Sequence, residues 1–408
     1  MQQALGIFQR ATPEQLWKLT RPANKHDKLV RDTLLDLQEH RLVRVESKRE
    51  DNRQVWVLTA RGHREARSLL PREIRVSALR KEEYHPVTGK LLGTGYDDHA
   101  LAVTATAAEM TRAGFGALLA WQTEVSHPLR GGYVQYADAV VKASAANVPV
   151  LLLEVDRLNE GVDDLVHKLR RYTEFFERLA PGADKEQPER AQRPDTIDQE
   201  LRLWRNIYPR TGREGYPPIA FVFADGSEVT MDNTMRALEE RGRAYWQGRR
   251  YQPHFRALNY HPVIPVVVTT LDRLQEHGAD AAVWRRLGRD HWQTLTAALD
   301  NPNGARLYEK ELTQARAQTA ARAAAAREKR RPVCAGCGTK FTDERWEQTE
   351  RRRDWGDDGT LCAACQEQKA ETEIAAQIAR IAPPEPAAWQ EASPETPKGW
   401  LKGLGRRR

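Results

Sequence analysis

The sequence predicts a multidomain protein of mixed α+β and α/β class. Three observations support this prediction: two helices followed by a basic hairpin near the N-terminus, alternating strands and helices in the middle, and two Cys-x-x-Cys pairs near the C-terminus. At 408 residues the chain also exceeds the usual size of one domain. We therefore expect an N-terminal winged helix-turn-helix, a central mixed sheet flanked by helices, and a C-terminal zinc-ribbon-like module.

The composition is that of a charged protein that is not inserted in a membrane. Lys and Arg number 64 against 57 Asp and Glu, and 40% of the residues are apolar. No run reaches the roughly 18 apolar residues that a membrane-spanning helix needs, and no secretory signal opens the sequence. We therefore expect a cytoplasmic protein. Residues 1–80 hold 17 basic and 10 acidic side chains, an excess equal to the net charge of +7 of the whole chain.

Residues 1–80 show the order of elements of a winged helix-turn-helix. Thr12 and Pro13 are start signals for a first helix, because Thr caps helices and Pro suits their first position. The other predicted elements are an amphipathic helix over 26–41, strands over 42–45 and 55–58 around a polar turn, and a helix that begins at 59.

The position of the positive charge predicts that this domain binds double-stranded DNA. The second helix of such a domain fits the major groove, and the hairpin, or wing, lies along the backbone or in the minor groove. Some winged helices bind protein instead, but the local charge excess favours nucleic acid. The side chains expected to face DNA are Lys25, Lys28 and Arg31 from the helix and Lys48, Arg49 and Arg53 from the wing.

Strands and helices alternate over residues 96–290. The predicted order is a helix over 98–110, strands over 117–124, 133–141 and 148–155, a helix over 162–179, a strand over 219–224, a helix over 233–247 and a strand over 263–269. This order describes a mixed sheet with helices on its faces. Charge and proline in residues 181–215 predict an insertion, with one short helix over 198–208.

The C-terminal part divides into three segments by composition. Residues 303–331 are rich in Ala, Arg and Glu, which predicts a long, solvated, basic linker helix. Residues 332–370 contain the cysteines. Residues 371–408 are rich in Pro, Ala and Glu and are expected to form a disordered tail, because this composition does not supply a core.

The four cysteines have the spacing of a structural zinc site. They are Cys334, Cys337, Cys362 and Cys365, two Cys-x-x-Cys pairs separated by 24 residues. Four thiolates satisfy tetrahedral zinc and leave no open position, so the ion would fold a small module and not catalyse a reaction. The alternative is two separate redox pairs. It is disfavoured because neither pair lies in a thioredoxin-like pattern.

Acidic side chains lie at the ends of strands in the middle domain. Glu154 and Asp156 close an apolar strand and share one face of it, and Asp138 on a neighbouring strand can meet them there. Clustered carboxylates repel one another unless a hard cation such as magnesium or manganese neutralises them. Such a site hydrolyses phosphodiesters, with Lys168 of the next helix stabilising the developing charge. The alternative is that these acids are solvated strand ends.

The order and spacing of these residues resemble a known family. The pattern consists of Asp138, Glu154-Val155-Asp156-Arg157 and Lys168-Leu169-Arg170-Arg171-Tyr172, with Asp98-His99 opening the first core helix and residues 269–274 following the last strand. It resembles the nuclease core of the PD-(D/E)xK superfamily. Joined to a winged helix, it resembles the actinobacterial replication-relaxation family of plasmid proteins, and its layout is similar to MobC-type relaxases. The resemblance covers about residues 10–290.

The resemblance implies a plasmid or mobile-element DNA-processing protein. It would be a metal-dependent endonuclease or a relaxase-like nickase that acts on duplex DNA, at a plasmid origin, with replication or conjugative transfer machinery as partner. One departure from the family pattern is Asp156, which stands where the superfamily has Lys, so that Lys168 would have to replace it. His99 and Glu109 are further candidates for the metal shell.

Two other functions stay open from the sequence. The first is a non-catalytic, DNA-binding replication initiator or regulator with a degenerate nuclease fold. The second is an adaptor that uses the zinc module within a replication or transfer complex. The chain has no paired-histidine motif of the HUH relaxases, and no Gly-rich loop with Lys and Ser or Thr marks a nucleotide-hydrolysing motor.

Overall fold

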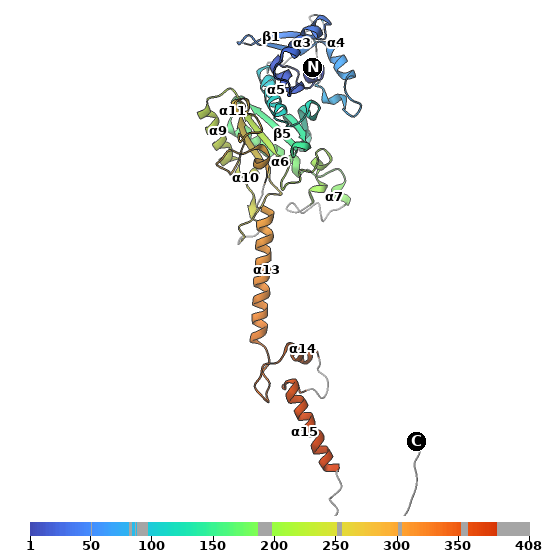
Figure 1. Ribbon diagram of the computed structural model, residues 1–408, viewed down its shortest axis with the longest axis vertical. Helices are drawn as coiled ribbons and strands as arrows, with labels where there is room; N and C mark the ends of the chain where they lie inside the picture. The colour runs from blue at the N-terminus through green and yellow to red at the C-terminus, as the bar shows by residue number, and fades with distance from the viewer. Residues whose placement is uncertain are drawn as a thin grey trace, which may run out of the picture. The chain divides into compact units, whose positions relative to one another are not determined.

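A computed structural model describes residues 1–49, 51–80, 84–85, 87, 97–186, 198–250, 255–300, 304–351 and 358–381. The chain forms two compact units, Met1–Thr313 and Gln314–Arg408. Within the described ranges, no helix is long and apolar enough to cross a membrane. The first unit combines helices with a six-stranded mixed sheet (Figure 1).

The N-terminal elements follow the predicted order. They are α1 (Gln2–Phe8), α2 (Pro13–Thr20), α3 (Lys28–Glu39), β1 (Val43–Lys48), β2 (Gln54–Leu58), α4 (Ala60–Ser68) and the 3-10 turn η1 (Val76–Ala78). The Thr12 cap is confirmed, because its hydroxyl accepts a hydrogen bond from the Gln15 N–H at 3.3 Å. The Gln15 side chain accepts in turn from the Thr12 N–H at 2.9 Å, which completes a capping box.

No signal in the sequence predicts α1. This helix has seven residues and no capping side chain. Seven residues make about two turns, which is too short for apolar periodicity to stand out. Its residues from Ala4 to Phe8 are nevertheless buried, so tertiary packing stabilises the helix.

The hairpin of β1 and β2 packs closely against the helix that follows it. The two strands are antiparallel, with Val43 opposite Leu58. A Cβ atom on Gly62 of α4 would lie 1.9 Å from the Leu42 carbonyl oxygen. Only glycine therefore allows α4 to approach the start of the wing this closely.

The six strands of the main sheet lie in the order β10-β9-β6-β5-β4-β3. β3, β4 and β5 are antiparallel neighbours, β5, β6 and β9 are parallel, and β10 is antiparallel to β9. The strands are β3 (Trp121–Pro128), β4 (Val134–Ala143), β5 (Val148–Asp156), β6 (Ile219–Phe223), β9 (Val266–Thr270) and β10 (Arg285–Arg286), and a separate hairpin pairs β7 (Arg249–Arg250) with β8 (Leu258–Asn259). The predicted mixed sheet is confirmed.

Helices cover both faces of this sheet (Figure 1). They are α5 (Asp97–Arg112), α6 (Val162–Glu177), α9 (Glu228–Arg241), α10 (Arg243–Trp246), α11 (Leu271–His277) and α12 (Leu295–Leu299), whereas the short α7 (Ala183–Glu186) belongs to the insertion after α6. One hydrophobic cluster joins the sheet to α5, α11 and α12, and a second joins it to α6 and α9. β5 is buried along nearly its whole length, which explains why its sequence is almost wholly apolar.

The N-terminal elements, α1 to α4 with β1 and β2, share the first of these clusters with the sheet. The rings of Phe8 in α1 and Trp121 in β3 lie 6.1 Å apart, and the Thr123 hydroxyl donates to the Ile7 carbonyl at 2.6 Å. A buried ion pair joins Lys18 of α2 to Glu109 of α5 at 2.6 Å. Residues 1–80 are thus packed on the middle sheet through a common core. The domain boundary predicted near residue 80 lies inside this unit and stays a prediction.

Two predicted elements of the sheet region differ in extent. β3 begins at Trp121 and not at residue 117, because Leu118–Ala120 forms a 3-10 turn, η2. The helix predicted over 233–247 begins earlier, behind a cap in which the Ser227 hydroxyl accepts from a backbone N–H. It is also divided at Gly242 into α9 and α10.

The insertion predicted over 181–215 is anchored to the core where it is described. Residues 187–197 lie outside the described residues. The helix predicted over 198–208 is replaced by two 3-10 turns, η5 (Asp198–Leu201) and η6 (Leu203–Asn206). Trp204 and Tyr208 are only 1% and 3% exposed and belong to the cluster under α6. Their burial holds a polar segment in place without regular helix.

The second unit contains a long helix and the cysteine module. α13 (Gly304–Lys329) begins in the first unit, continues into the second and runs over most of the predicted linker helix; α14 (Asp343–Arg351) and α15 (Ala363–Ile381) follow. α15 is helical over residues 371–381, where a disordered tail is predicted. Its content of Ala, Glu and Gln explains the difference, because these residues favour helix even without a core. The rest of the predicted tail, residues 382–408, lies outside the described residues.

Candidate functional site

The carboxyl end of β5 gathers the acidic and basic side chains predicted for catalysis. Glu154 and Asp156 lie on β5, Asp138 lies on the adjacent strand β4, and Lys168 lies on α6. The Lys168 Nζ atom lies 2.9 Å from a Glu154 oxygen and 2.9 Å from a Glu160 oxygen. Because α6 packs against the face of the sheet that Glu154 occupies, Lys168 reaches the end of the preceding strand.

Glu154 is buried and both of its oxygens are engaged. Its side chain is 1% exposed, Lys168 pairs with Oε2, and the Tyr172 hydroxyl donates to Oε1. Burial raises the pKa of Glu154 to about 7, against the attraction of Lys168. Burial by itself lowers the pKa of Lys168, but Glu154 and then Asp138 outweigh it and raise the pKa overall. Lys168 is therefore held in its charged form.

Asp138 is fixed by two hydrogen-bonding contacts. One oxygen lies 3.1 Å from His99 Nε2, and the other accepts from the Val155 N–H at 2.7 Å. The hydrogen bond with Asp138 raises the pKa of His99 and outweighs the effect of burial. Of the two residues considered for a metal shell, His99 contacts Asp138, whereas Glu109 is paired with Lys18.

Asp156 carries a buried oxygen that has no partner. The residue is 3% exposed, and its Oδ2 atom makes no hydrogen bond with the described residues. Burial, and then repulsion from Glu160, raise the pKa of Asp156, while the backbone N–H groups of Glu160 and Asn159 lower it. A buried carboxylate oxygen without a partner is uncommon in proteins and is consistent with a ligand position.

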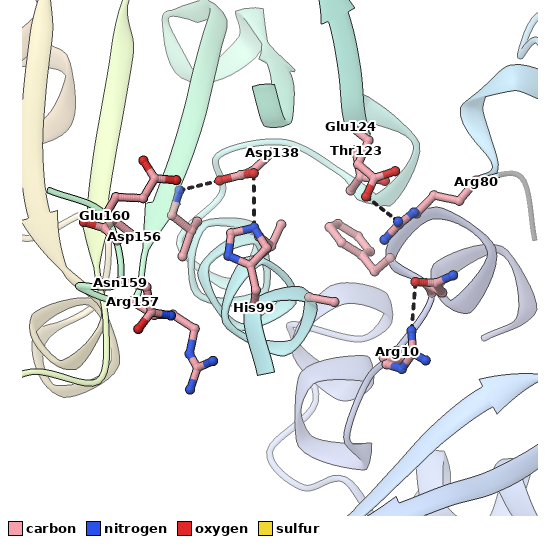
Figure 2. A pocket seen from close by; sticks show the side chains of 15 residues that line it. Arg10, Arg80, His99, Thr123, Glu124, Asp138, Asp156, Arg157, Asn159 and Glu160 are labelled. Carbon is pink, nitrogen blue, oxygen red and sulfur yellow. Dashed lines mark hydrogen bonds and ion pairs between the residues drawn. The ribbon is translucent and has the colours of Figure 1, made fainter. Parts of the chain in front are cut away.

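His99, Asp138 and Asp156 line a cavity of about 460 Å³, whereas Glu154, Lys168 and Tyr172 lie behind its wall and do not line it. Its core wall contains His99, Asp138, Asp156, Arg157, Asn159 and Glu160, and its other wall contains Phe8, Gln9, Arg10, Arg80 and Glu124 (Figure 2). The first four residues of this second wall belong to the winged-helix segment. The cavity is therefore formed by both parts of the first unit, and its volume is typical of ligand sites.

Unusual backbone conformations are concentrated around this cavity. Seven non-glycine residues in the described part of the chain have positive φ, and Gln9 (69°), Glu124 (51°) and Leu158 (57°) are among them. Gln9 and Glu124 line the cavity, and Leu158 lies between two residues that do. Three of the other positions are Asn52, Asn147 and Asp225, and Asn and Asp tolerate positive φ better than other residue types do. Such conformations cost about 1–3 kcal/mol each and tend to occur at functional sites.

The three predicted metal carboxylates do not form one tight cluster. Over the described residues, the four cysteines are the group of metal-ligating side chains whose ligand atoms all lie within 4.8 Å of one another. Asp138 and Asp156 line the same cavity, whereas Glu154 is turned toward Lys168 and Tyr172. The predicted magnesium or manganese site stays a prediction, with Asp138 and Asp156 as its accessible members.

Three residues of the site receive no role from the sequence, although Tyr172 is part of the motif that carries the family resemblance. Tyr172 stands four residues after Lys168, and this spacing places both side chains on one face of α6. The spacing could have indicated its role. Gln9 and Arg80 carry no such signal, because their place in the wall depends on how the winged-helix segment packs against the sheet.

The six basic residues predicted to face DNA are all exposed. They are Lys25, Lys28, Arg31, Lys48, Arg49 and Arg53. Arg31 pairs with Asp27 at 2.9 Å, and Arg53 pairs with Glu14 at 2.8 Å and with Asp51 at 2.6 Å. Exposed pairs of this kind contribute little energy, so an anionic partner can replace them. DNA binding by these residues stays a prediction.

The four cysteines converge in the second unit, with every Sγ atom within 4.8 Å of the others. The backbone N–H groups of Gly336 and Cys362 donate to Cys334 Sγ at 3.4 and 3.2 Å. The hydrogen bond from Cys362 is the main cause that lowers the pKa of Cys334 to about 6, which favours the thiolate at neutral pH. Four convergent thiols are compatible with a closed, structural zinc site and disfavour two independent redox pairs.

The cysteine module has a very small core besides the cysteines. Phe341 and Trp346 are its buried apolar side chains. The guanidinium groups of Arg327 and Arg331 lie over the Trp346 ring, 4.7 and 5.5 Å from its centroid. Arg331 also pairs with Asp343 at 2.6 Å. A core this small is not enough to stabilise a module of this size. The stability of the module is therefore expected to depend on a bound metal ion.

We expect the purified protein to contain about one zinc ion per chain, because four thiolates complete a tetrahedral shell. Cys362→Ser should lose the ion. The control Ala364→Ser, which adds a hydroxyl between Cys362 and Cys365 without removing a thiol, should keep it. Metal analysis by mass spectrometry measures the content, and the absorption spectrum detects iron. Protein without zinc, or with an iron–sulfur chromophore, would contradict the assignment.

The stability of the first unit should depend on pH through Glu154. Its pKa in the folded protein, about 7, lies above its ordinary value of 4.5. The stabilising contribution is therefore full below pH 4.5 and is lost as pH rises through 7. Lys168→Met removes the opposing cation, so its Tm should fall more steeply with rising pH than that of the wild type. Breaking such a buried pair costs about 3–5 kcal/mol.

The matched control for this measurement is Arg170→Met, an exposed position on the same helix. Thermal unfolding followed by near-ultraviolet circular dichroism gives Tm between about pH 5 and pH 8, the range over which the Glu154 contribution changes. Parallel curves for Lys168→Met and the wild type would show that Lys168 does not stabilise the buried carboxylate.

Comparison with known proteins gives one match. No curated protein and no solved structure matches the chain. The resemblance inferred from the sequence is confirmed in its coarser part, whereas the actinobacterial plasmid origin and the nuclease core stay predictions. Residues 3–189, which include the N-terminal helices and hairpin and the candidate site at β4, β5 and α6, match the model of the replication-relaxation family.

Proposed function

We propose that this protein processes double-stranded DNA in the replication or conjugative transfer of a plasmid or mobile element. The winged helix binds the duplex, and the cavity at the end of β5 hydrolyses a phosphodiester, as a metal-dependent endonuclease or nickase. One observation supports this most: the replication-relaxation match spans both the winged helix and the residues Asp138, Glu154, Asp156 and Lys168. The two parts also pack on one hydrophobic cluster.

Binding is assigned to the exposed basic residues of α3 and the wing. Lys28 and Arg31 lie in the first turns of α3, and Arg49 and Arg53 flank the tip of the hairpin. A helix of this size fits the major groove, while the wing contacts the backbone. Each phosphate neutralised by Lys or Arg releases counterions, so the affinity depends strongly on salt.

Asp138 and Asp156 are the proposed ligands of a magnesium or manganese ion. Both line the cavity, and Asp156 has a buried oxygen that lacks a partner within the described residues. This all-oxygen donor set suits a hard divalent cation. A bound ion would polarise the phosphate and lower the pKa of an attacking water.

Lys168 is the proposed group that stabilises the charge developing on the transferred phosphate. Glu154 holds it at 2.9 Å and keeps it protonated, so Glu154 acts by positioning Lys168. Tyr172 fixes the other oxygen of Glu154 from the same helix. The predicted role of Glu154 as a metal ligand requires these two contacts to open, which makes Asp138 and Asp156 the stronger candidates.

A second candidate is a DNA-binding initiator or regulator that does not cut. The observation that favours it is the environment of Glu154, whose two oxygens are already satisfied by Lys168 and Tyr172. The position two residues later is Asp156, where the related nuclease motif has Lys. The two candidates share the winged helix and differ only in whether DNA is cleaved.

The proposed hydrolysis predicts that Asp138→Asn, Asp156→Asn and Lys168→Ala each lower turnover by about 10²–10³-fold, because removing one group that stabilises transition-state charge has this effect. The assay follows conversion of supercoiled plasmid that carries the cognate origin to open circle, with magnesium or manganese. Asp163→Asn, an exposed acid on α6, is the control. EDTA should stop the reaction.

Duplex binding should remain in these three variants, since affinity belongs to the winged helix. If the wild-type protein binds origin DNA but leaves it intact with every divalent metal tested, the proposed hydrolysis is wrong. The binding-only candidate would then stand.

The DNA interface predicts that the double variant Lys28→Glu, Arg31→Glu loses duplex binding. The affinity falls with salt, and losing two phosphate contacts should make the slope of log affinity against log salt shallower by about 2. Fluorescence anisotropy with a labelled duplex at several salt concentrations measures both. The control Lys142→Glu, Arg170→Glu makes the same change of charge at exposed positions of the middle domain. Equal losses in both double variants would place the binding surface elsewhere.

A further inference from the structure

We propose that Arg80 forms a phosphate-binding site in the cavity, on the wall opposite Asp156 and Glu160. Its ligand is a phosphate of the DNA strand next to the phosphodiester that is cut, so the identity of the ligand rests on the proposed function. Figure 2 shows Arg80 and Glu124 on one side of the cavity and Asp156 and Glu160 on the other, with Asp138 and His99 between them.

The main chain of Arg80 is held at both ends. Its N–H donates to the Gly6 carbonyl of α1 at 2.9 Å, and its carbonyl oxygen lies 2.9 Å from His63 Nε2 of α4. The segment that carries Arg80 is thereby fixed against two helices of the winged-helix part. Because little conformational freedom remains to be lost, a cation held in this way is preorganised for an anionic ligand.

The guanidinium of Arg80 is only partly used. One NH2 group is paired with Glu124, and the Nε–H is buried without a hydrogen-bond partner among the described residues. Arg80 is 18% exposed, whereas Glu124 is 59% exposed. An Arg presents a planar fork of donors that suits two oxygens of one phosphate, so a phosphate can engage more of the fork than Glu124 does.

Glu124 has the features of an anion that a ligand can displace. It lies mostly in solvent, and its backbone is in the left-handed region, with φ of 51°. An exposed carboxylate loses little when its ion pair is exchanged, because water solvates it again. In this arrangement Glu124 competes with the phosphate for Arg80.

The cavity holds a phosphate site and the catalytic acids together. Its volume of about 460 Å³ fits a segment of about one nucleotide, so a strand with one phosphate near Asp138 and Asp156 can place the adjoining phosphate near Arg80. Arg10 also lines this wall, but it is paired with Glu46 at 2.9 Å and with the Gln9 side chain. Arg80 is therefore the stronger candidate for binding a phosphate.

The plain alternative is that Arg80 and Glu124 only hold the winged helix against the sheet. Removing either residue would then weaken the same contact, and neither change would affect an anion. The phosphate site predicts opposite effects instead, because Arg80 is the ligand's partner and Glu124 is its competitor. This difference in sign separates the two explanations.

The test is isothermal titration calorimetry of the full chain with thymidine 3′,5′-bisphosphate as the probe, in EDTA so that no metal contributes. We expect Arg80→Gln to weaken binding by about tenfold or more, since charge-assisted contacts to phosphate are strong. Arg80→Lys should weaken it less, and Glu124→Gln should strengthen it. Arg75→Gln, an exposed position of the same segment, is the control and should not change it. The Tm of each variant verifies folding.

Several outcomes would overturn the proposal. They are no binding to the wild type, equal binding to Arg80→Gln and Arg75→Gln, or weaker binding to Glu124→Gln. A short oligothymidine that fails to compete with the bisphosphate would overturn the assignment to a DNA strand. Arg80-dependent binding in a protein that never cuts plasmid would refute the hydrolysis and support this site. If the protein cuts plasmid but Arg80→Gln binds the bisphosphate as well as the wild type does, the hydrolysis is supported and the phosphate site at Arg80 is refuted.

Discussion

The packing of α1 against the sheet is the contact on which the first unit depends. Phe8 lies against Trp121, and burying one large apolar side chain contributes about 1.5–3 kcal/mol. This contact brings Gln9 and Arg80 to the cavity and sets the N-terminal elements in one orientation against β3 and α5. Without it, the acids at the end of β5 would face solvent on one side, because the cavity would lose the wall that contains Gln9 and Arg80.

Burial then divides the acidic residues into two kinds. Glu154 lies beneath the surface, where its charge is costly and only Lys168 and Tyr172 make it tolerable. Asp138 and Asp156 lie at the cavity and keep part of their hydrogen-bonding capacity for a ligand. One carboxylate thus holds the Lys168 ammonium group, while two others line the cavity.

The two units are stabilised by different interactions. The first has two extensive hydrophobic clusters on the faces of one sheet, and a few local strains such as that at Gln9 are small beside them. The second has four thiols, Phe341 and Trp346, and a long helix exposed nearly all round. Loss of metal is therefore expected to unfold the cysteine module and to leave the sheet intact.

The sequence by itself determined what depends on neighbours along the chain. The Thr12 cap, the apolar run of β5, the mixed sheet and the cysteine pairs follow from local spacing, and so does the contact of Lys168 with the end of β5. Only the tertiary structure decided that α1 forms and that Arg80 lines the cavity. It also turned Glu154 toward Lys168 and Tyr172, while Asp138 and Asp156 line the cavity. The physical reason is that these features arise from packing between segments far apart in sequence, which no local pattern records.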